Sequence, residues 1–350
     1  MKPFVRKAVR ELAAYTPGEQ PKECDIIKLN TNENAYPPSP KITELFNRPL
    51  ERLRLYPDPV CLELREALAE YHGCKPEQIF VGNGSDEVLA MCVRAFVERD
   101  GSVGYFEPSY SLYPVLAAIH ELVTKPVRLN KDFSWNMPKD YSASLFFLAN
   151  PNAPTSIQYP ESTIESFCRG FPGVVLIDEA YVDFAGYNCV KLALSMDNVL
   201  VARTYSKSFS LAGLRVGYVI GAKPLIDAFY KIKDSYNIDR LAQEIALTAV
   251  RDASHMRRNV ERIVETRARV SAELKKRGFT VFPSNTNFLW VKPPKLGARA
   301  MFEALRKQKI LVRYFLNPLT ADYLRITIAT VAEMTALLTA LDGIFQSLEK

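Results

Sequence analysis

Apolar residues recur along positions 60–220 in two alternating patterns, one helical and one typical of buried strands. The segments 62–71 and 87–98 have helical spacing. Short, mostly apolar runs occupy positions 78–81, 102–106, 145–149, 174–177 and 199–202. Such runs predict strands that are buried on both faces, as in parallel or mixed sheets covered by helices. The pattern therefore predicts an α/β fold with a mostly parallel central sheet.

The pattern changes after Gly221. Helical spacing continues to about Arg277, and two short strands at 288–291 and 323–328 then stand between helices. Because 350 residues are many for one hydrophobic core, the change predicts a second, smaller α+β domain. The predicted boundaries are 35–245 for the large domain, and 1–34 with 246–350 for the small domain.

Composition and charge argue against several classes of function. Hydrophobic residues make up 48% and charged residues 24% of the chain, as in ordinary globular proteins, and the net charge is only +6. The richest basic stretch, 257–269, is interrupted by Glu261 and Glu265 at helical spacing, as on a solvated helix face. We therefore predict no nucleic-acid partner. No apolar run approaches the length of a membrane span, so we also predict no membrane association.

Cysteine and histidine usage bears on the compartment and on metals. The six cysteines form no Cys-x-x-Cys pair, and the chain has only three histidines. Without metal-ligand spacing, we predict no metal site. The basic N-terminus has no apolar core behind it, unlike a secretory signal. Scattered cysteines suit a reducing compartment, so we predict a cytoplasmic protein.

Lys207 is the first candidate for chemistry. It follows the apolar run 199–202 and stands among hydroxyl residues, with Arg203 and Arg215 nearby in the chain. Burial and positive charge both lower the pKa of an amine, and a lowered pKa lets lysine form a Schiff base with a carbonyl compound. Taken alone, Lys207 is better explained as an exposed loop residue, where most lysines lie, and only its partners elsewhere in the chain favour the chemical role.

Two further side chains follow predicted strands, at the edge where open α/β sheets bind ligands. Asp178 follows the run 174–177 and would be a nearly buried carboxylate. It suits a protonated pyridine nitrogen, or it caps the next segment. Tyr110 follows another strand and suits either stacking on a flat ring or packing in the core.

A third group of residues suits a phosphate. Gly84, Ser85 and Asp86 lie between a predicted strand and a helix, whose free N–H groups favour an anion. An ordinary turn with a cap is the alternative. Ser206 and Arg215 add a hydroxyl and a guanidinium for the same phosphate. An amine, a carboxylate, a phosphate site and a stacking ring together match the needs of pyridoxal 5′-phosphate.

The motifs occur in a specific order along the chain. They are LN-x-NEN at 29–34, YPD at 56–58, GNGSDE at 82–87, NPN-x-PT at 150–155, DEAY at 178–181, SK at 206–207, GLR-x-GY at 213–218 and LRIT at 324–327. Each is common alone. In this order, over nearly the whole chain, they resemble the fold-type I pyridoxal-phosphate-dependent aminotransferases, and among them the histidinol-phosphate aminotransferases.

The resemblance implies a role for each residue. Lys207 would bind the cofactor covalently and move a proton during amino transfer, Asp178 would pair with the pyridine nitrogen, and Tyr181 would contact the ring 3′-oxygen. Residues expected around the rest of the cofactor are Gly84, Ser85, Asp86, Tyr110, Asn152, Thr204, Ser206 and Arg215. Substrate contacts are expected from Tyr15, Asn34, Arg313 and Arg325. Tyr56 is expected to reach the cofactor phosphate of a neighbouring subunit, which implies a homodimer.

Three stretches depart from the family pattern. Ala153 and Ser156 stand where the family often has asparagine and glycine. Either Asn152 supplies the missing amide to the ring 3′-oxygen, or Tyr181 carries more of that role. Ala329 replaces a glycine, as does a proline of the pair 37–38. These last changes concern the fit of the substrate rather than the cofactor.

By the same resemblance, the substrates are L-histidinol phosphate and L-glutamate or 2-oxoglutarate. All are anions, which Arg325 with Arg313 would bind through bidentate contacts. The alternatives are a strand-end salt bridge for Arg325 and an exposed side chain for Arg313. An aromatic amino-acid aminotransferase or a threonine-phosphate decarboxylase would share the cofactor residues. A homologue that binds the cofactor without turnover is a further alternative.

Overall fold

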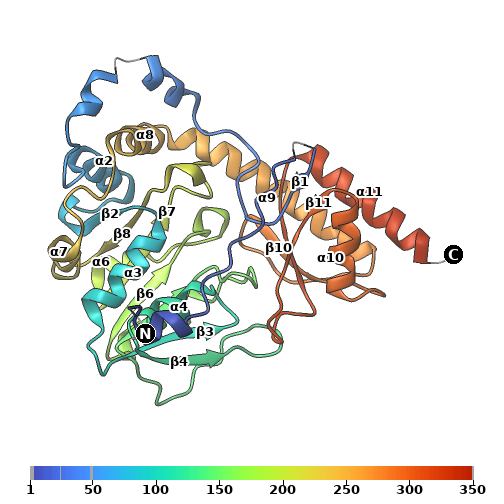
Figure 1. Cartoon of the computed structure of the whole chain (residues 1–350), viewed down its shortest axis with the longest axis horizontal. Coiled ribbons are helices and arrows are strands. Elements are labelled where there is room, and N and C mark those ends of the chain that lie inside the picture. Colours follow the sequence, from blue (N-terminus) through green and yellow to red (C-terminus); the bar gives the residue numbers. More distant parts are fainter. Residues whose placement is uncertain (1–3, 24, 48–49, 349–350) are drawn as a thin grey trace.

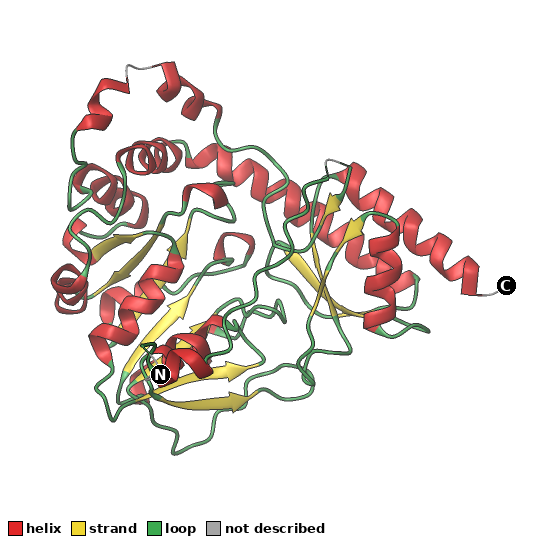
Figure 2. Ribbon diagram, in the orientation of Figure 1, coloured by secondary structure: helices red, strands yellow, loops and turns green. Residues whose placement is uncertain are grey.

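The computed structural model describes residues 4–23, 25–47 and 50–348, and its main feature is a seven-stranded sheet (Figure 2). Along the sheet the strands are β2 (Ile79–Gly82), β8 (Gly217–Gly221), β7 (Val199–Thr204), β6 (Val174–Asp178), β5 (Leu145–Ala149), β3 (Ser102–Glu107) and β4 (Val123–Arg128). Pairing is parallel from β4 to β7, whereas β8 runs antiparallel to both of its neighbours. The predicted mostly parallel sheet is therefore confirmed.

Helices cover both faces of this sheet, which explains why its strands are apolar throughout. In β5, Leu145 and Phe147 join one buried cluster, and Phe146 and Leu148 join the other. The first face packs on α3 (Ser85–Phe96), α4 (Leu112–Ile119) and α7 (Lys223–Ile232). The opposite face packs on α2 (Leu62–His72), α5 (Glu161–Gly170), α6 (Val190–Ser195) and α8 (Arg240–Arg251). Burial on both faces is the expected arrangement for parallel strands.

A second, antiparallel sheet follows the long helix α9 (Ala253–Lys276), which runs from α8 toward β10 (Figure 1). Its strands, in spatial order, are β12 (Arg313–Tyr314), β13 (Leu324–Thr327), β10 (Phe288–Lys292) and β9 (Thr280–Val281). The helices α10 (Ala298–Lys307) and α11 (Val331–Leu348) lie on this side of the molecule (Figure 1). The predicted change from α/β to α+β character after the central sheet is thus present.

The N-terminal part of the chain lies between the two sheets. The short helix α1 (Lys7–Glu11) contacts α4, and β1 (Ile27–Lys28) pairs in parallel with β11 (Ile310–Leu311). This pairing joins the start of the chain to its C-terminal third. The boundaries at 34/35 and 245/246 stay predictions. Among the described residues, no helix is long and apolar enough to cross a bilayer.

Candidate active site

A cavity of about 650 Å³ lies where the carboxyl ends of β5, β6 and β7 face the N-terminal segment and the second sheet. Parallel strands end at one edge of a sheet, so polar residues that follow different strands meet there. We call one side the sheet wall, formed by Ser85, Asp86, Asp178, Thr204, Ser206, Lys207 and Arg215. We call the other the arginine wall, formed by Tyr15, Asn30, Thr31, Asn32, Glu33, Arg313 and Arg325.

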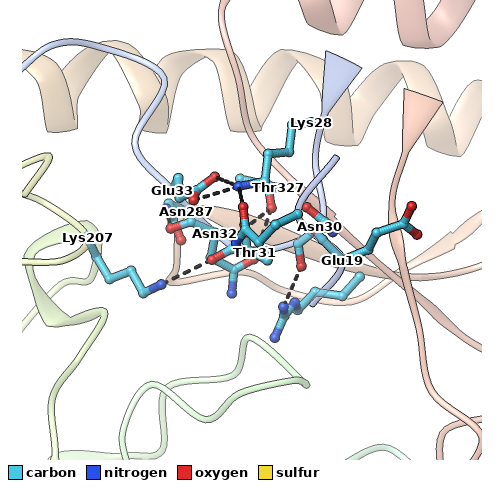
Figure 3. Close-up of polar contacts among 11 residues, drawn as sticks. Glu19, Lys28, Asn30, Thr31, Asn32, Glu33, Lys207, Asn287 and Thr327 are labelled. Atoms are coloured by element: carbon cyan, nitrogen blue, oxygen red, sulfur yellow. Dashed lines mark hydrogen bonds and ion pairs between the residues drawn. The ribbon is translucent and has the colours of Figure 1, made fainter. Parts of the chain in front are cut away.

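Lys207 projects from the loop after β7 toward the arginine wall. Its Nζ donates a hydrogen bond to the carbonyl oxygen of Thr31 at 3.1 Å, as Figure 3 shows. Burial and, after it, the guanidinium of Arg325 lower the pKa of this amine to about 8. A fraction of the amine is therefore neutral near pH 7.5, and a neutral amine can act as a nucleophile or take up a proton.

Asp178 is the last residue of β6, and its side chain is nearly buried. Its Oδ2 accepts a hydrogen bond from the hydroxyl of Tyr113 at 2.8 Å, and its Oδ1 accepts one from the backbone N–H of Ala180 at 3.1 Å. Burial raises the pKa of the carboxyl to about 6, although both hydrogen bonds act in the opposite direction. A carboxylate so poorly hydrated would be stabilised strongly by a cation in the cavity.

An anion site is formed where α3 begins. No side chain caps this helix, so its first N–H groups are available to a ligand. Arg215 lies across the helix start: it donates to Ser206 Oγ at 3.3 Å and pairs with Asp86 at 3.2 Å. A Cβ at Gly84, where φ is +80°, would come within 2.5 Å of Arg215 Nη2. At Gly217, a Cβ would come within 2.4 Å of the backbone nitrogen of Ser85. Gly84 therefore lets Arg215 lie close to the start of α3, and Gly217 lets its strand lie close to the backbone of Ser85.

The arginine wall carries two guanidinium groups side by side. Arg313 on β12 and Arg325 on β13 are direct cross-strand partners. Arg325 Nη2 donates to the carbonyl oxygen of Asn30 at 2.8 Å, while its buried Nε has no partner among the residues the structure describes. Burial lowers the pKa of Arg325. An unpaired buried N–H beside a cavity is suited to an anionic ligand.

Arg313 is held by the N-terminal segment. Its guanidinium donates to the carbonyl oxygens of Thr16 at 3.0 Å and Pro17 at 3.2 Å. The neighbouring Tyr15 reaches across the cavity, and its ring meets that of Tyr110 edge-on at 5.8 Å between centroids. Gly18 allows the segment to lie close, because a Cβ there would be 2.4 Å from Thr31 Cγ2.

The chain is similar to known proteins along nearly its whole length. The family described as Aminotransferase class I and II matches residues 24–341. The histidinol-phosphate aminotransferase of Microcystis aeruginosa is 41% identical over 340 residues, which cover 97% of this chain and 98% of that protein. The histidinol-phosphate aminotransferase of Chromohalobacter salexigens is 44% identical over 352 residues, covering 98% of this chain and 99% of that protein. The chain belongs to the class I and II aminotransferase family.

Solved structures share the fold of this aminotransferase. The histidinol-phosphate aminotransferase from Sinorhizobium meliloti, in complex with pyridoxal-5′-phosphate, is 27% identical with a TM-score of 0.83. The match covers 92% of this chain and 91% of that one. The L-threonine-O-3-phosphate decarboxylase from Porphyromonas gingivalis has a TM-score of 0.80 at 20% identity, covering 92% of this chain and 100% of that one. At that identity the likeness concerns the fold alone. The predicted fold-type I family is confirmed.

The sheet wall fits pyridoxal 5′-phosphate, the cofactor of the aminotransferase family. The free N–H groups at the start of α3, with Arg215, suit its phosphate. The poorly hydrated carboxylate of Asp178 suits a protonated pyridine nitrogen, and the Lys207 amine suits its aldehyde. Among the described residues, no group of His, Cys, Asp or Glu is arranged to hold a metal ion.

Most of the predicted site residues of this aminotransferase line the one cavity. They are Tyr15, Ser85, Asp86, Tyr110, Asp178, Tyr181, Thr204, Ser206, Lys207, Arg215, Arg313 and Arg325. Gly84 lies just behind, against Arg215. The individual roles of these residues stay predictions, but their convergence from seven stretches of sequence is what a single ligand site requires.

Asn152 does not line the cavity, although its neighbours Pro151 and Ala153 do. Its side chain is fully buried, and its amide nitrogen donates to the carbonyl oxygen of Pro108 at 3.1 Å and to Thr155 Oγ1 at 2.8 Å. Its Oδ1 accepts a hydrogen bond from Ser109 at 2.7 Å. The amide thus braces the loop that carries Tyr110. It does not take the place of the family's asparagine, which is Ala153 in this chain. Of the two possibilities raised by the sequence, the geometry favours Tyr181.

Asn34 and Tyr56 also lie outside the cavity. Asn34 Nδ2 donates to the carbonyl oxygens of Lys207 at 3.0 Å and Ser208 at 3.1 Å, so it braces the lysine loop from behind. Tyr56 is 75% exposed and stacks on Tyr236 at 4.3 Å between ring centroids. An exposed tyrosine pair is compatible with a contact to another subunit.

Sequence reasoning missed two groups that support the site. Tyr113 was not singled out from the sequence, yet its hydroxyl donates a hydrogen bond to Asp178 Oδ2. Arg203, counted among the charges near Lys207, instead pairs with Glu179 at 2.8 Å, and both side chains are almost fully buried. The positive charge acting on Lys207 comes mainly from Arg325 and then Arg215. Side-chain direction from strand alternation gives the signal: Arg203 and Thr204 are successive residues of β7 and face opposite sides.

Proposed function

We propose that this aminotransferase transfers the amino group of L-histidinol phosphate to 2-oxoglutarate, giving imidazole-acetol phosphate and L-glutamate, a reaction of histidine biosynthesis. The support is twofold. Relatives that match nearly the whole chain are named histidinol-phosphate aminotransferases. The observation that supports this proposal most is that Lys207, Asp178 and two adjacent arginines line one cavity, because all proposed substrates combine an amine or carbonyl group with an anionic end.

The residues of the sheet wall hold and tune the cofactor. Bound pyridoxal phosphate supplies an aldehyde that exchanges amino groups and a ring that withdraws electrons from the substrate carbon. Asp178 keeps the ring nitrogen protonated by its charge, and Ser206 and Arg215 bind the phosphate. Lys207, with its pKa lowered to about 8, takes the proton from the amine-bearing carbon of the substrate and returns it.

The arginine wall orients the substrate. Arg325 is positioned to bind the phosphate of histidinol phosphate and the carboxylate of glutamate in turn, with its unpaired Nε as an available donor. Arg313 and Tyr15 lie beside it and would contact the same anion. A shared anion site lets two substrates of different length present their reacting carbon to one lysine.

We propose further that the active unit is a homodimer, in which Tyr56 reaches the cofactor phosphate of the other subunit. Tyr56 does not line the cavity of its own chain, and Leu53 and Leu55 in the same stretch of sequence are also exposed. We also propose a cytoplasmic enzyme, because the five described cysteines are all unpaired. Light scattering of the purified protein tests the dimer. Weaker cofactor binding in Tyr56→Phe, with dimerisation unchanged, tests the contact.

Steady-state kinetics test the reaction. The purified protein, supplied with pyridoxal phosphate, is expected to form glutamate from histidinol phosphate and 2-oxoglutarate with a higher kcat/KM than from phenylalanine or tyrosine. A preference for the aromatic amino acids would identify an aromatic aminotransferase instead. Release of carbon dioxide from threonine phosphate without any need for 2-oxoglutarate would identify a decarboxylase. No spectral change on adding glutamate would indicate a homologue without turnover.

A further inference from the structure

Asn32 joins the arginine wall to Tyr181, and its contacts fix which way its amide points. The backbone N–H of Asn32 donates to Thr327 Oγ1 at 3.1 Å. The Thr327 hydroxyl in turn donates to Asn32 Oδ1 at 3.0 Å. The Thr327 hydroxyl is buried, and Asn32 Oδ1 is the only acceptor for its proton among the described residues, so the amide oxygen faces Thr327 and the amide NH₂ faces the opposite way. Asn287 Nδ2, donating to the Asn32 carbonyl oxygen at 3.0 Å, completes the support (Figure 3).

The orientation of the Asn32 amide determines whether the Tyr181 hydroxyl accepts or donates in their hydrogen bond. Asn32 Nδ2 donates to Tyr181 Oη at 2.9 Å, and this is the only hydrogen bond of that hydroxyl among the described residues. Because the oxygen accepts this bond, its own proton is free to point away from Asn32. Tyr181 lines the cavity together with Asp178 and Lys207, so the proton is available to a ligand there. Burial raises the pKa of Tyr181, which keeps that proton in place.

We propose that Asn32 is a positioning residue that presets Tyr181 as a hydrogen-bond donor to the ring oxygen of the bound cofactor. This proposal rests on the proposed function, since it requires pyridoxal phosphate in the cavity. It also explains how the site works without an amide at position 153: Ala153 carries no donor, and Asn152 is committed to Pro108 and Thr155.

The arrangement also couples the two walls. Thr327 and Arg325 are two residues apart on β13, so their side chains lie on the same face of that strand. The strand that carries the substrate-binding guanidinium therefore also holds the amide that orients Tyr181. Asn32 itself has a φ of +56°, a left-handed conformation that asparagine and aspartate tolerate better than most residues.

The test is the pH midpoint of the visible absorption band of the cofactor-loaded protein, measured without substrate. A donor beside the ring oxygen stabilises its deprotonated form, so loss of that donor raises the midpoint. Asn32→Asp keeps the shape but replaces the NH₂ donor by an acceptor, which draws the Tyr181 proton toward itself. We expect the midpoint to rise by about 1 pH unit, as in Tyr181→Phe. Thr327→Val, which frees the amide to turn over without adding charge, is expected to give about half of that rise.

A double-mutant cycle separates positioning from a simple charge effect. If Asn32 acts through Tyr181, Asn32→Asp shifts the midpoint far less in the Tyr181→Phe background than in the native protein. An equal shift in both backgrounds would overturn the proposal, as would a native midpoint in Thr327→Val. Thr320→Val is the matched control: it makes the same change at the cavity without touching Tyr181, and its midpoint is expected to stay native.

Two further outcomes are distinguishable. If Asn32→Asp fails to fold, Thr327→Val with and without Tyr181→Phe decides the question by the same comparison. If the native protein shows no visible band when supplied with pyridoxal phosphate, the proposed function fails and not only the role of Asn32.

Discussion

The two walls of the cavity differ in how the chain builds them. On the sheet wall, polar groups come directly after strands of one sheet: Asp178 ends β6, Thr204 ends β7, and Lys207 follows three residues later. The arginine wall joins two distant parts of the chain, the N-terminal stretches 15–20 and 30–33 and the C-terminal stretch 313–325. Its contacts run largely through backbone carbonyl oxygens, such as those of Thr16 and Asn30.

The positions of the residues on the two walls are therefore specified by the sequence in different ways. Residues at strand ends are placed by the strands themselves, so a motif in the sequence is enough to locate them. A backbone carbonyl carries no signature in the sequence, because every residue has one. The arginine wall therefore depends on how the N-terminal segment packs, and we expect it to be more easily disturbed by changes remote from the ligand.

The largest expected effect lies on the sheet wall. Lys207→Ala removes the amine that we propose binds the cofactor and moves the proton, so we expect the rate of amino transfer to fall by at least about 10³-fold. The cofactor itself should still bind weakly through Arg215 and Asp178. Turnover with histidinol phosphate and 2-oxoglutarate measures the loss. An undiminished rate would remove Lys207 from the mechanism.

The buried ion pair between Arg203 and Glu179 supports the sheet wall, and it can be removed by a substitution that changes no residue lining the cavity. Glu179→Gln leaves the buried guanidinium of Arg203 without its main partner, so we expect the free energy of unfolding to fall by about 3 kcal/mol. Denaturant unfolding measures this. Glu165→Gln, which breaks the exposed pair with Arg169, is the matched control and should change stability by less than about 0.5 kcal/mol. Equal effects would mean that the buried pair is not structural.

On the arginine wall, Arg325→Ala should weaken both substrates. Loss of a charge-assisted contact raises KM for glutamate and for histidinol phosphate by about 10- to 100-fold. Arg313→Ala is expected to act in the same direction but less, since that guanidinium is partly engaged by Thr16 and Pro17. Steady-state kinetics with each substrate measures both. An effect on one substrate alone would show that the anion site is not shared.

The pH dependence of cofactor binding tests Asp178. The pKa of its carboxyl is raised by burial to about 6 in the empty cavity, so the side chain is charged above that pH and neutral below it. Only the charged form attracts the pyridine nitrogen, and cofactor affinity should therefore fall by about tenfold per unit as pH drops below 6. Titrations at pH 5 to 8 measure the affinity. Asp178→Asn should lose this inflection, and an unchanged profile in that variant would assign it elsewhere.

The smallest expected effect concerns the packing of the N-terminal segment on Thr31. It tests most directly whether the two walls of the cavity are independent. Gly18→Ala would push the N-terminal segment off Thr31, so we expect KM for both substrates to rise by about fivefold while the cofactor band stays native. Gly297→Ala is the matched control, because a Cβ there meets nothing within 4 Å. A changed cofactor band in Gly18→Ala would show that the two walls are not independent.

Sequence reasoning placed five strands of the central sheet, β2, β3, β5, β6 and β7, within a few residues, because their apolar runs are buried on both faces. It did not predict β4, whose side chains are mostly exposed, or β8, which runs antiparallel to both of its neighbours. It grouped Lys207, Asp178 and Arg215 on what proves to be one cavity, but it left Asn152 as an alternative to Tyr181 at the ring and counted Arg203 among the charges near the lysine. In both cases a side chain reaches buried partners that lie elsewhere in the sequence.

The sequence by itself determined the family, the sheet and the residues that follow its strands, because local patterns and short motifs carry that information. The tertiary structure alone decided which polar groups face the cavity and which brace it from behind. Asn32 shows the reason: its role depends on one hydroxyl of β13 and one of the loop after β6, and only folding brings these together.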